Sequence, residues 1–420
     1  MLGAWMAIAF TACSNEDVPD GGKGTYVKFT ATDEQTLKMS KSVPYLEYSI
    51  DGGTSWNLLG ENSVSFGNGT TLLLRGKNEN GTDGATIVFS DDNVKVACTG
   101  DIRMLVDYEN YATANTSRAT FKSLFNDCVE LTSAPALPAT ILADKCYQYM
   151  FAGCKSLTKA PSLPATTLTD YCYDRMFVLC SSMTKAPSLP ATVLADYCYN
   201  GMFALCSSLT NAPDLPATTL AYSCYSQMFA NCQSLVNVPS LPATALAPKC
   251  YESMFTGCSS LLKAPALPAT TLVSGCYRDM FSGCSSLTSA PSLPATDLAD
   301  QCYDHMFVAC TSLVDAPDLS ATILAPYCYR YMFYRCTSLK IAPVLPAPTL
   351  LLGCYISMFE DCNSLADVTM LATTINDVHS LDNWLIRVSS NGMFTKSRQM
   401  TTLPDGANGI PYGWSILNAQ

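Results

Sequence analysis

The stretch 146-CYQYMFAGCKSLTKAPSLPAT-166 returns 26 residues later as 172-CYDRMFVLCSSMTKAPSLPAT-192. Two cysteines, a tyrosine and a Met-Phe pair keep the same offsets in both copies. Self-similarity at a fixed period of this length is typical of repeat architectures. The recurring cysteines pose the main question, because they could form a metal site, disulfides, a catalytic centre or the lining of an interior.

The repeat continues along the chain at a constant spacing of 26 residues, with no insertion. Its apolar pair recurs as Leu124-Phe125, Met150-Phe151, Met176-Phe177, Met202-Phe203, Met228-Phe229, Met254-Phe255, Met280-Phe281, Met306-Phe307, Met332-Phe333 and Met358-Phe359. One cysteine column, Cys128 through Cys362, stands three residues after each Phe, and a second, Cys146 through Cys354, stands five residues before it. The two columns hold 19 of the 21 cysteines, which makes the sulfur part of the repeat itself.

The first half of each repeat predicts a short helix. One apolar stripe has the spacing i, i+4, i+8 and i+12 and is widened by two aromatic residues, which is typical of one helix face. The stripe consists of Leu168, Cys172, Met176 and Cys180, with Tyr173 and Phe177 beside it. Thr166 is placed to cap this helix, and Asp170 lies in its first turn, where the helix dipole favours negative charge.

The second half of each repeat predicts a brief strand. Met183 and Ala186 begin an extended segment, and Pro187 and Pro190 lack the N–H groups that a longer ladder requires. One strand and one helix per 26 residues indicate an α/β solenoid of the leucine-rich-repeat type with about ten coils. A single coil buries too little apolar surface to offset its ordering entropy, so the coils are expected to stack.

Geometry argues against most reactive roles for the cysteines. Cys172 and Cys180 would lie about 12 Å apart along a helix, whereas a disulfide requires Cα atoms within roughly 7 Å. Stacked equivalents come closer, but their Cβ vectors are nearly parallel; a bond across the columns, such as Cys180 with Cys198, is the alternative left open. No C-x-x-C spacing indicates zinc, and with only His305 and His379 in the chain almost no cysteine has a base nearby. We therefore interpret the columns as buried free thiols and expect no metal or cofactor.

The unit "MFxxCxSLTxAPxLPATTLAxxCY" resembles the BspA-like leucine-rich repeats of Bacteroidetes surface proteins over about 120–365. The flanking segments "YLEYSIDGGTSW" and "GANGIPYGWSI" also resemble segments that accompany this repeat in gut Bacteroides proteins. The resemblance implies a lipid-anchored solenoid on the cell surface that serves adhesion or ligand capture.

The N-terminal residues 1–23 indicate export. An apolar run too short to span a bilayer precedes Cys13. The motif "FTAC" resembles a bacterial lipobox, in which Cys13 carries the lipid, and "SNED" resembles the export signal of Bacteroidetes surface lipoproteins. We expect an outer-membrane lipoprotein at the cell surface; an ordinary cleaved signal peptide with an incidental cysteine is the alternative.

The remaining segments divide the chain into further domains. Residues 24–106 contain short β-type runs with Asp51-Gly52, Asn68-Gly69 and Asn80-Gly81 as turns, which predicts a small antiparallel β domain. Within it, "SIDGGTSW" matches the Asp-box pattern of sialidase-type propellers, but a single copy indicates a hairpin device. The solenoid is expected over 107–366, and a degenerate repeat with a C-terminal cap over 367–420.

Composition and motifs exclude several functions. The formal net charge is -11, and no basic stripe is present that could neutralise nucleic-acid or membrane phosphates. No phosphate-binding loop, paired carboxylates or nucleophile elbow stands out, so we expect no enzyme.

Function is then expected at repeat positions whose residue changes from copy to copy, because the invariant positions build the scaffold. The later repeats are richer in Arg and aromatic residues, which are enriched at binding hot spots. The candidate ligand contacts are Arg278, Asp304, His305, Arg330, Tyr331, Tyr334 and Arg335. On the strand side, lysines lie early and Asp315 and Asp318 late. We expect a monomeric binding or adhesion protein for a host or bacterial surface protein or a glycan; the alternative is a structural spacer without a defined ligand.

Overall fold

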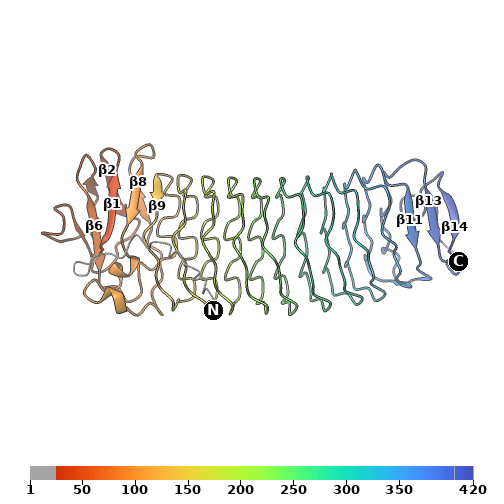
Figure 1. Cartoon of the computed structure of the whole chain (residues 1–420), viewed down its shortest axis with the longest axis horizontal. Coiled ribbons are helices and arrows are strands. Elements are labelled where there is room, and N and C mark those ends of the chain that lie inside the picture. Colours follow the sequence, from red (N-terminus) through yellow and green to blue (C-terminus); the bar gives the residue numbers. More distant parts are fainter. Residues whose placement is uncertain (1–24, 402, 420) are drawn as a thin grey trace, which may run out of the picture.

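The computed structural model describes residues 25–401 and 403–419, so the predicted lipidation site Cys13 lies outside the described residues. The described chain is a long stack of similar coils (Figure 1). Antiparallel strands lie at its N-terminal end, and three parallel strands lie at its C-terminal end.

Two sheets build the N-terminal end. Their strands are β1 (Val27–Ala31), β2 (Gln35–Met39), β3 (Leu46–Ser49), β4 (Asn57–Leu58), β5 (Val64–Phe66), β6 (Leu72–Gly76), β7 (Ile87–Phe89), β8 (Val96–Thr99) and β9 (Leu131–Ser133). One sheet has the order β4-β3-β6-β1-β8-β9 and the other β5-β2-β7. All pairs are antiparallel except β8 with β9, which is parallel. Since β9 belongs to the first coil, the sheet passes directly into the solenoid.

The core is continuous across this junction. The ring of Phe29 lies 6.5 Å from that of Phe66 and 6.1 Å from that of Phe89, both in the opposite sheet. It also lies 6.3 Å from Phe125, the first member of the Phe column. Two short 3-10 helices, η1 (Ile102–Leu105) and η2 (Tyr111–Thr113), follow β8. The N-terminal strands thereby cover apolar surface that the first coil would otherwise expose.

The helix predicted in each repeat does not form; the described residues contain no α-helix. In its place each coil has a run of tight turns, in which every fourth residue has positive φ. In the coil that contains Cys146 and Cys154, these residues are Lys145 (φ 60), Tyr149 (φ 56) and Gly153 (φ 73). A right-handed α-helix cannot contain such residues at regular intervals. The predicted α/β solenoid is therefore wrong in its α part, and the protein is a solenoid of stacked turns and short strands.

Hydrogen bonding explains why this arrangement wins. Alternate amides in the turn segment bond within the coil, as Met150 N–H does to Tyr147 O at 3.1 Å. The amides between them bond to the next coil: Tyr147 N–H donates to Cys172 O at 2.8 Å, and Phe151 N–H donates to Met176 O at 2.9 Å. A helix would satisfy its amides internally and would leave this half of each coil without backbone bonds to the neighbouring coils.

Aromatic ladders fill the interior. Neighbouring rings of the Phe column, from Phe125 to Phe359, stack at 5.3–5.8 Å. Those of the Tyr column, from Tyr147 to Tyr355, stack at 5.7–6.0 Å. Burial of each large apolar side chain contributes about 1.5–3 kcal/mol. Within this column the hydroxyls of Tyr147, Tyr225 and Tyr277 have no hydrogen-bond partner among the described protein atoms.

Both cysteine columns line the interior, as predicted. All twenty described cysteines are free and buried. In the column after Phe, each thiol from Cys154 to Cys362 lies 3.0–3.2 Å from the Phe carbonyl oxygen of the preceding coil and donates its S–H to it. This contact connects adjacent coils, so the sulfur is both an apolar filler and a weak donor.

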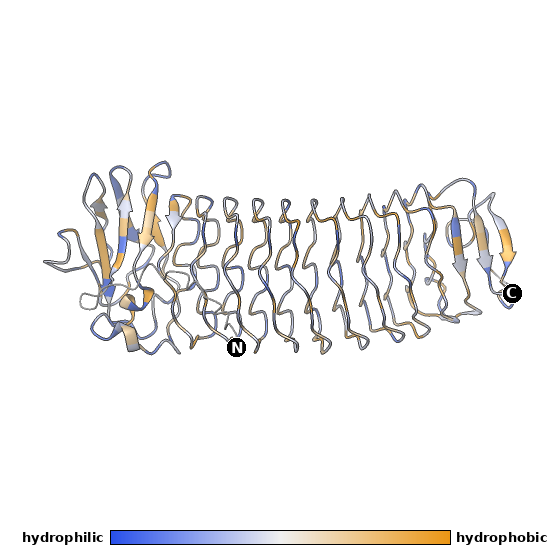
Figure 2. Cartoon of the chain, in the orientation of Figure 1, coloured by the Kyte–Doolittle hydropathy of each residue, from blue (hydrophilic) through white to orange (hydrophobic). Residues whose placement is uncertain are grey.

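The second half of each coil is extended, and its prolines limit the backbone pairing between neighbouring coils. Most coils meet there through single parallel bridges, such as Lys159 with Lys185 and Ser289 with Asp315. β10 (Thr349–Leu350) and β12 (Thr374–Ile375) form a two-residue parallel pair. Hydrophobic and polar residues alternate closely along these coils (Figure 2), which is expected where one side of the backbone faces the core.

Parallel strands continue the stack at the C-terminal end. They are β11 (Asp367–Met370), β13 (Met393–Lys396) and β14 (Ser415–Asn418). Trp384 replaces the repeat methionine, is fully buried and donates its indole N–H to Gly409 O at 2.8 Å. Ser380 replaces the cysteine and donates to Leu351 O at 2.9 Å.

Candidate functional site

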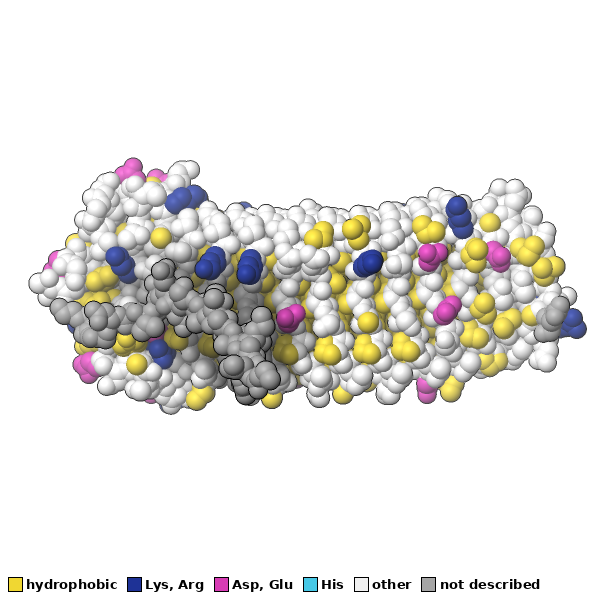
Figure 3. Space-filling view, in the orientation of Figure 1, with side chains coloured by type: hydrophobic (Ala, Val, Ile, Leu, Met, Phe, Trp, Pro, Cys, Tyr) yellow, Lys and Arg dark blue, Asp and Glu magenta, His cyan; other side chains and the backbone are white. Residues whose placement is uncertain are grey.

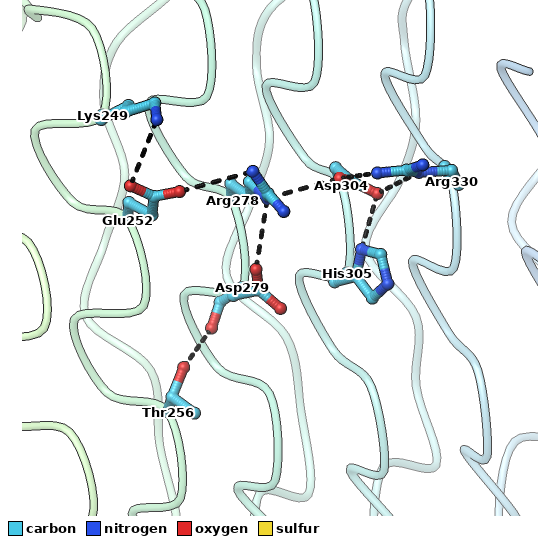
Figure 4. A network of polar contacts seen from close by, with 8 residues as sticks. All are labelled: Lys249, Glu252, Thr256, Arg278, Asp279, Asp304, His305 and Arg330. Atoms are coloured by element: carbon cyan, nitrogen blue, oxygen red, sulfur yellow. Dashed lines mark hydrogen bonds and ion pairs between the residues drawn. The ribbon is translucent and has the colours of Figure 1, made fainter.

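One polar position recurs in every coil, directly after the buried tyrosine. At intervals of 26 residues it holds Gln148, Asp174, Asn200, Ser226, Glu252, Arg278, Asp304, Arg330, Ile356 and Asp382. We call this set the polar column. In its centre the charges alternate from coil to coil, because Glu252, Arg278, Asp304 and Arg330 follow one another. Stacking at constant register places these side chains side by side (Figure 4).

Asp304 is the centre of this charged segment. Its side chain is 0% exposed. Arg330 donates to both carboxylate oxygens, from Nε to Oδ1 at 3.0 Å and from Nη2 to Oδ2 at 2.8 Å. His305 Nδ1 lies 2.7 Å from Oδ1, and Arg278 Nε lies 3.5 Å from Oδ2. The bidentate pair is the strongest form of a charge-assisted bond between these groups.

The ionisation of this group follows from its contacts. Burial by itself would raise the pKa of Asp304, but the hydrogen bonds from His305 and Arg330 outweigh it and leave the pKa below its usual value. The same pair raises the pKa of Arg330. The charged forms are therefore the stable ones at neutral pH.

Arg278 joins Asp304 to the preceding coil. Arg278 Nη1 lies 3.6 Å from Glu252 Oε1, and Arg278 Nε lies 3.4 Å from Asp279 Oδ2. Burial raises the pKa of Asp279. Glu252 and Asp279 were not predicted from the sequence; the alternation of charge at a 26-residue interval could have revealed Glu252.

Aromatic side chains extend the site to the next coil. His305 and Tyr331 stack at 4.7 Å, and Tyr334 meets Tyr331 edge-on at 5.6 Å. The Arg335 guanidinium lies 4.9 Å from the centre of the Tyr334 ring. The structure thus connects all seven predicted contact residues in one continuous group. Asp304 is buried within it, and its outer members are Arg330, Tyr331, Tyr334 and Arg335. We call these four the Arg-Tyr patch.

Asp304 requires a correction. The sequence placed it among residues that touch a ligand, but its carboxylate is completely buried and is already bonded by Arg330 and His305. Its role is to position these two side chains, since a buried charge is stable only with such partners.

The Asp-box residues form a closed local network. Asp51 Oδ1 accepts hydrogen bonds from Thr54 N and Ser55 N, both at 3.0 Å, and Oδ2 accepts from Ser55 Oγ at 2.6 Å. Trp56 Nε1 donates to Gly53 O at 3.1 Å. The hydrogen bonds from Ser55 lower the pKa of Asp51. Every feature of the motif is used to fold the hairpin between β3 and β4.

Charge is unevenly distributed on the face drawn in Figure 3. Basic side chains lie mostly over the N-terminal half of the molecule, whereas acidic side chains lie both at the N-terminal end and over the later coils. Among residues 25–401 and 403–419 no group of three or more His, Cys, Asp or Glu side chains could hold a metal ion. Within the same part of the chain, no helix has the length and apolar content to cross a membrane.

These features define the class of the protein: a solenoid of stacked, nearly identical coils with buried sulfur and aromatic columns. The family profile described as "BspA type Leucine rich repeat region" matches residues 118–262, 198–340 and 255–380, with six copies. The matches cover more than half of the chain, which belongs to this family of leucine-rich repeat proteins. No curated protein and no solved structure matches the chain significantly.

Proposed function

We propose that the chain is a non-enzymatic binding or adhesion protein that presents its solenoid to a protein or glycan ligand at the cell surface. The observation that carries this proposal is the Arg-Tyr patch. Four long side chains of the types enriched at hot spots lie together on two turns of one coil. The buried Asp304 fixes Arg330 before any ligand arrives, which reduces the entropy cost of binding.

The repeat itself supplies variants that test the patch without disturbing the coil. Tyr331 has φ 55, and Ser357 occupies the same position one coil later with φ 48. Ala204 and Ala230 occupy the position of Tyr334 in earlier coils. The double variant Tyr331→Ser, Tyr334→Ala should therefore fold like the parent. Tyr45→Ser with Tyr412→Ala is the matched control, since these tyrosines are 70% and 78% exposed. Tyr45 directly precedes β3 and Tyr412 precedes β14, so both lie outside the coil that carries the patch.

The measurement is binding of the purified protein to arrays of host and bacterial surface proteins and of glycans. We expect a retained ligand whose affinity falls at least tenfold in the patch variant and stays unchanged in the control. Retention of full affinity in the patch variant would remove the patch from the proposal. The structural spacer is the second candidate, and it would be supported if no ligand is retained by the parent protein.

We also propose that Cys13 carries a lipid that anchors the chain in the outer membrane. The proposal is supported by the "FTAC" motif and by the family, whose members are often exposed at surfaces. Cys13→Ser should move the protein from the membrane fraction to the soluble fraction of the producing cell, with loss of incorporated fatty acid. An unchanged distribution would favour the ordinary signal peptide.

A further inference from the structure

A cavity lies along the polar column, and its last coil stands three coils before the Arg-Tyr patch. Its volume is about 300 Å³, and it spans four coils. It is lined by Tyr171, Arg175, Tyr197, Asn200, Tyr222, Ser223, Ser226, Gln227, Lys249 and Glu252. We propose that this cavity, which we call the tyrosine pocket, binds one neutral sugar ring of a glycan. The inference rests on the proposed binding function and names a ligand class for it.

Aromatic side chains form one wall of the tyrosine pocket. Tyr171 and Tyr197 stack at 4.7 Å with an angle of 9° between their planes. Tyr222 meets Tyr197 at 5.3 Å and 63°. The Tyr171–Tyr197 stack is closer than any in the interior ladders, where neighbouring rings lie at least 5.3 Å apart. A tyrosine combines an apolar ring with a hydroxyl, so it suits a ligand that has both C–H and O–H groups.

The floor of the pocket is polar and fixed in orientation. Asn200 is 6% exposed, and Ser223 and Ser226 are also buried. Asn200 Nδ2 donates to Asp174 Oδ1 at 2.8 Å, and Gln148 Nε2 donates to Asp174 Oδ2 at 2.7 Å. Since the amide nitrogen of Asn200 is engaged, its carbonyl oxygen is the atom that is left to accept from a ligand.

Each charged side chain that lines the pocket has a partner of opposite sign. Glu252 lies 4.0 Å from Lys249 and 3.6 Å from Arg278, and the buried Asp174 lies 3.4 Å from Arg175. A phosphate or carboxylate ligand would meet Glu252, and a cationic ligand would meet Arg175 and Lys249. Because these charges are already paired, the pocket favours a neutral ligand that both donates and accepts hydrogen bonds, which describes a hexose.

Size limits the ligand further. Sites for small molecules span roughly 300–1,000 Å³, and the tyrosine pocket lies at the lower end. It therefore fits a single ring, with the rest of a glycan chain outside. A peptide would need a longer groove with several side-chain pockets.

The test uses the purified full chain and methyl glycosides of glucose, galactose and mannose in saturation-transfer NMR, followed by titration of the tightest one. Tyr197→Ser copies Ser223 of the next coil, which has φ 48 against φ 56 for Tyr197. Glu252→Gln copies Gln148 of the same column. We expect each variant to reduce the affinity for the glycoside at least tenfold, whereas Tyr45→Ser leaves it unchanged; matching melting curves check the fold.

Each result decides the proposal. Loss of glycoside binding in both pocket variants supports it. Absence of any glycoside signal in the parent at millimolar concentration overturns it, and so does binding that the pocket variants leave intact. If the arrays retain a protein ligand while no glycoside binds, the sugar pocket fails and the proposed binding function stands. If neither arrays nor glycosides give binding, both fail.

Discussion

The substitution Asp304→Asn tests the central contact of the polar column. It keeps the size of the side chain, and Asn200 already occupies the same column four coils earlier. In the parent, the carboxylate accepts hydrogen bonds from Arg330 at 3.0 and 2.8 Å and contacts His305 Nδ1 at 2.7 Å. In the variant, an amide nitrogen, itself a donor, would face at least one of these donors. The change therefore removes the charge and replaces at least one attraction by a repulsion.

The expected loss follows from these contacts. Removing one partner of a buried ion pair typically costs about 3–5 kcal/mol. Here the Arg330 side chain is 28% exposed, so water can solvate part of the released guanidinium. We therefore expect the free energy of unfolding to fall by about 2–4 kcal/mol. Because a solenoid couples neighbouring coils most strongly, the weakened region should open before the rest.

Urea unfolding followed by circular dichroism measures the total loss, and hydrogen exchange with mass spectrometry locates it. Amides of the coils around residues 278–330 should exchange faster in Asp304→Asn than in the parent. Asp318→Asn is the control, since Asp318 is exposed in the same region of the chain. Arg330→Ile copies Ile356 of the next coil, and its combination with Asp304→Asn should cost less than the two single losses added together.

The reasoning would be refuted by a loss below about 0.5 kcal/mol with unchanged exchange. Strict additivity in the double variant would also contradict it, because two groups in direct contact cannot then be coupled. The pH dependence gives an independent check. The pKa of Asp304 is lower in the folded than in the unfolded protein, so its contribution is complete above the unfolded value of about 4 and is lost as the pH falls further.

Burial raises the pKa of Cys180 and Cys276 to about 12. Iodoacetamide at pH 8 should therefore modify none of the twenty described cysteines in the native protein, and all of them after unfolding without reductant. Mass spectrometry that finds disulfide-paired cysteines, or cysteines that react in the native protein, would contradict this prediction. Leu205→Gly should raise the free energy of unfolding by up to about 1 kcal/mol, because Leu205 has φ 64 and is 41% exposed. Gly353→Ala should lower the melting temperature, because its Cβ would lie 2.5 Å from the Tyr327 ring. Destabilisation by Leu205→Gly, or stabilisation by Gly353→Ala, would contradict the turn geometry. NMR titration of His379 should give a pKa above 6.5, because the hydrogen bond to Asp382 raises the pKa. The variant Asp382→Asn should return this pKa to the usual value. The stabilisation by this pair is present below the unfolded pKa of His379 and is lost as the pH rises through the folded pKa.

The candidate site was only partly predictable. The sequence singled out Arg330, Tyr331, Tyr334 and Arg335 because they interrupt a constant scaffold with residue types common at interfaces. The complete burial of Asp304 was not predictable, because Arg330 at the same repeat position is 28% exposed. Tyr171 and Tyr197 were not singled out because lysine, glycine and serine stand at equivalent positions, and Tyr222 was not because its equivalents are mostly aspartate and proline.

The 26-residue period, the stacking of coils and the inward direction of the Cys, Met, Phe and Tyr columns were determined by the sequence alone, because an invariant apolar position in every copy can be stable only in a shared interior. The conformation of the first half of each coil was decided by tertiary structure. The spacing i, i+4, i+8 is compatible with a helix, but it also fits a chain of turns with a strict period of four. The turns become more stable than the helix only because carbonyl oxygens of the neighbouring coil accept hydrogen bonds from alternate amides.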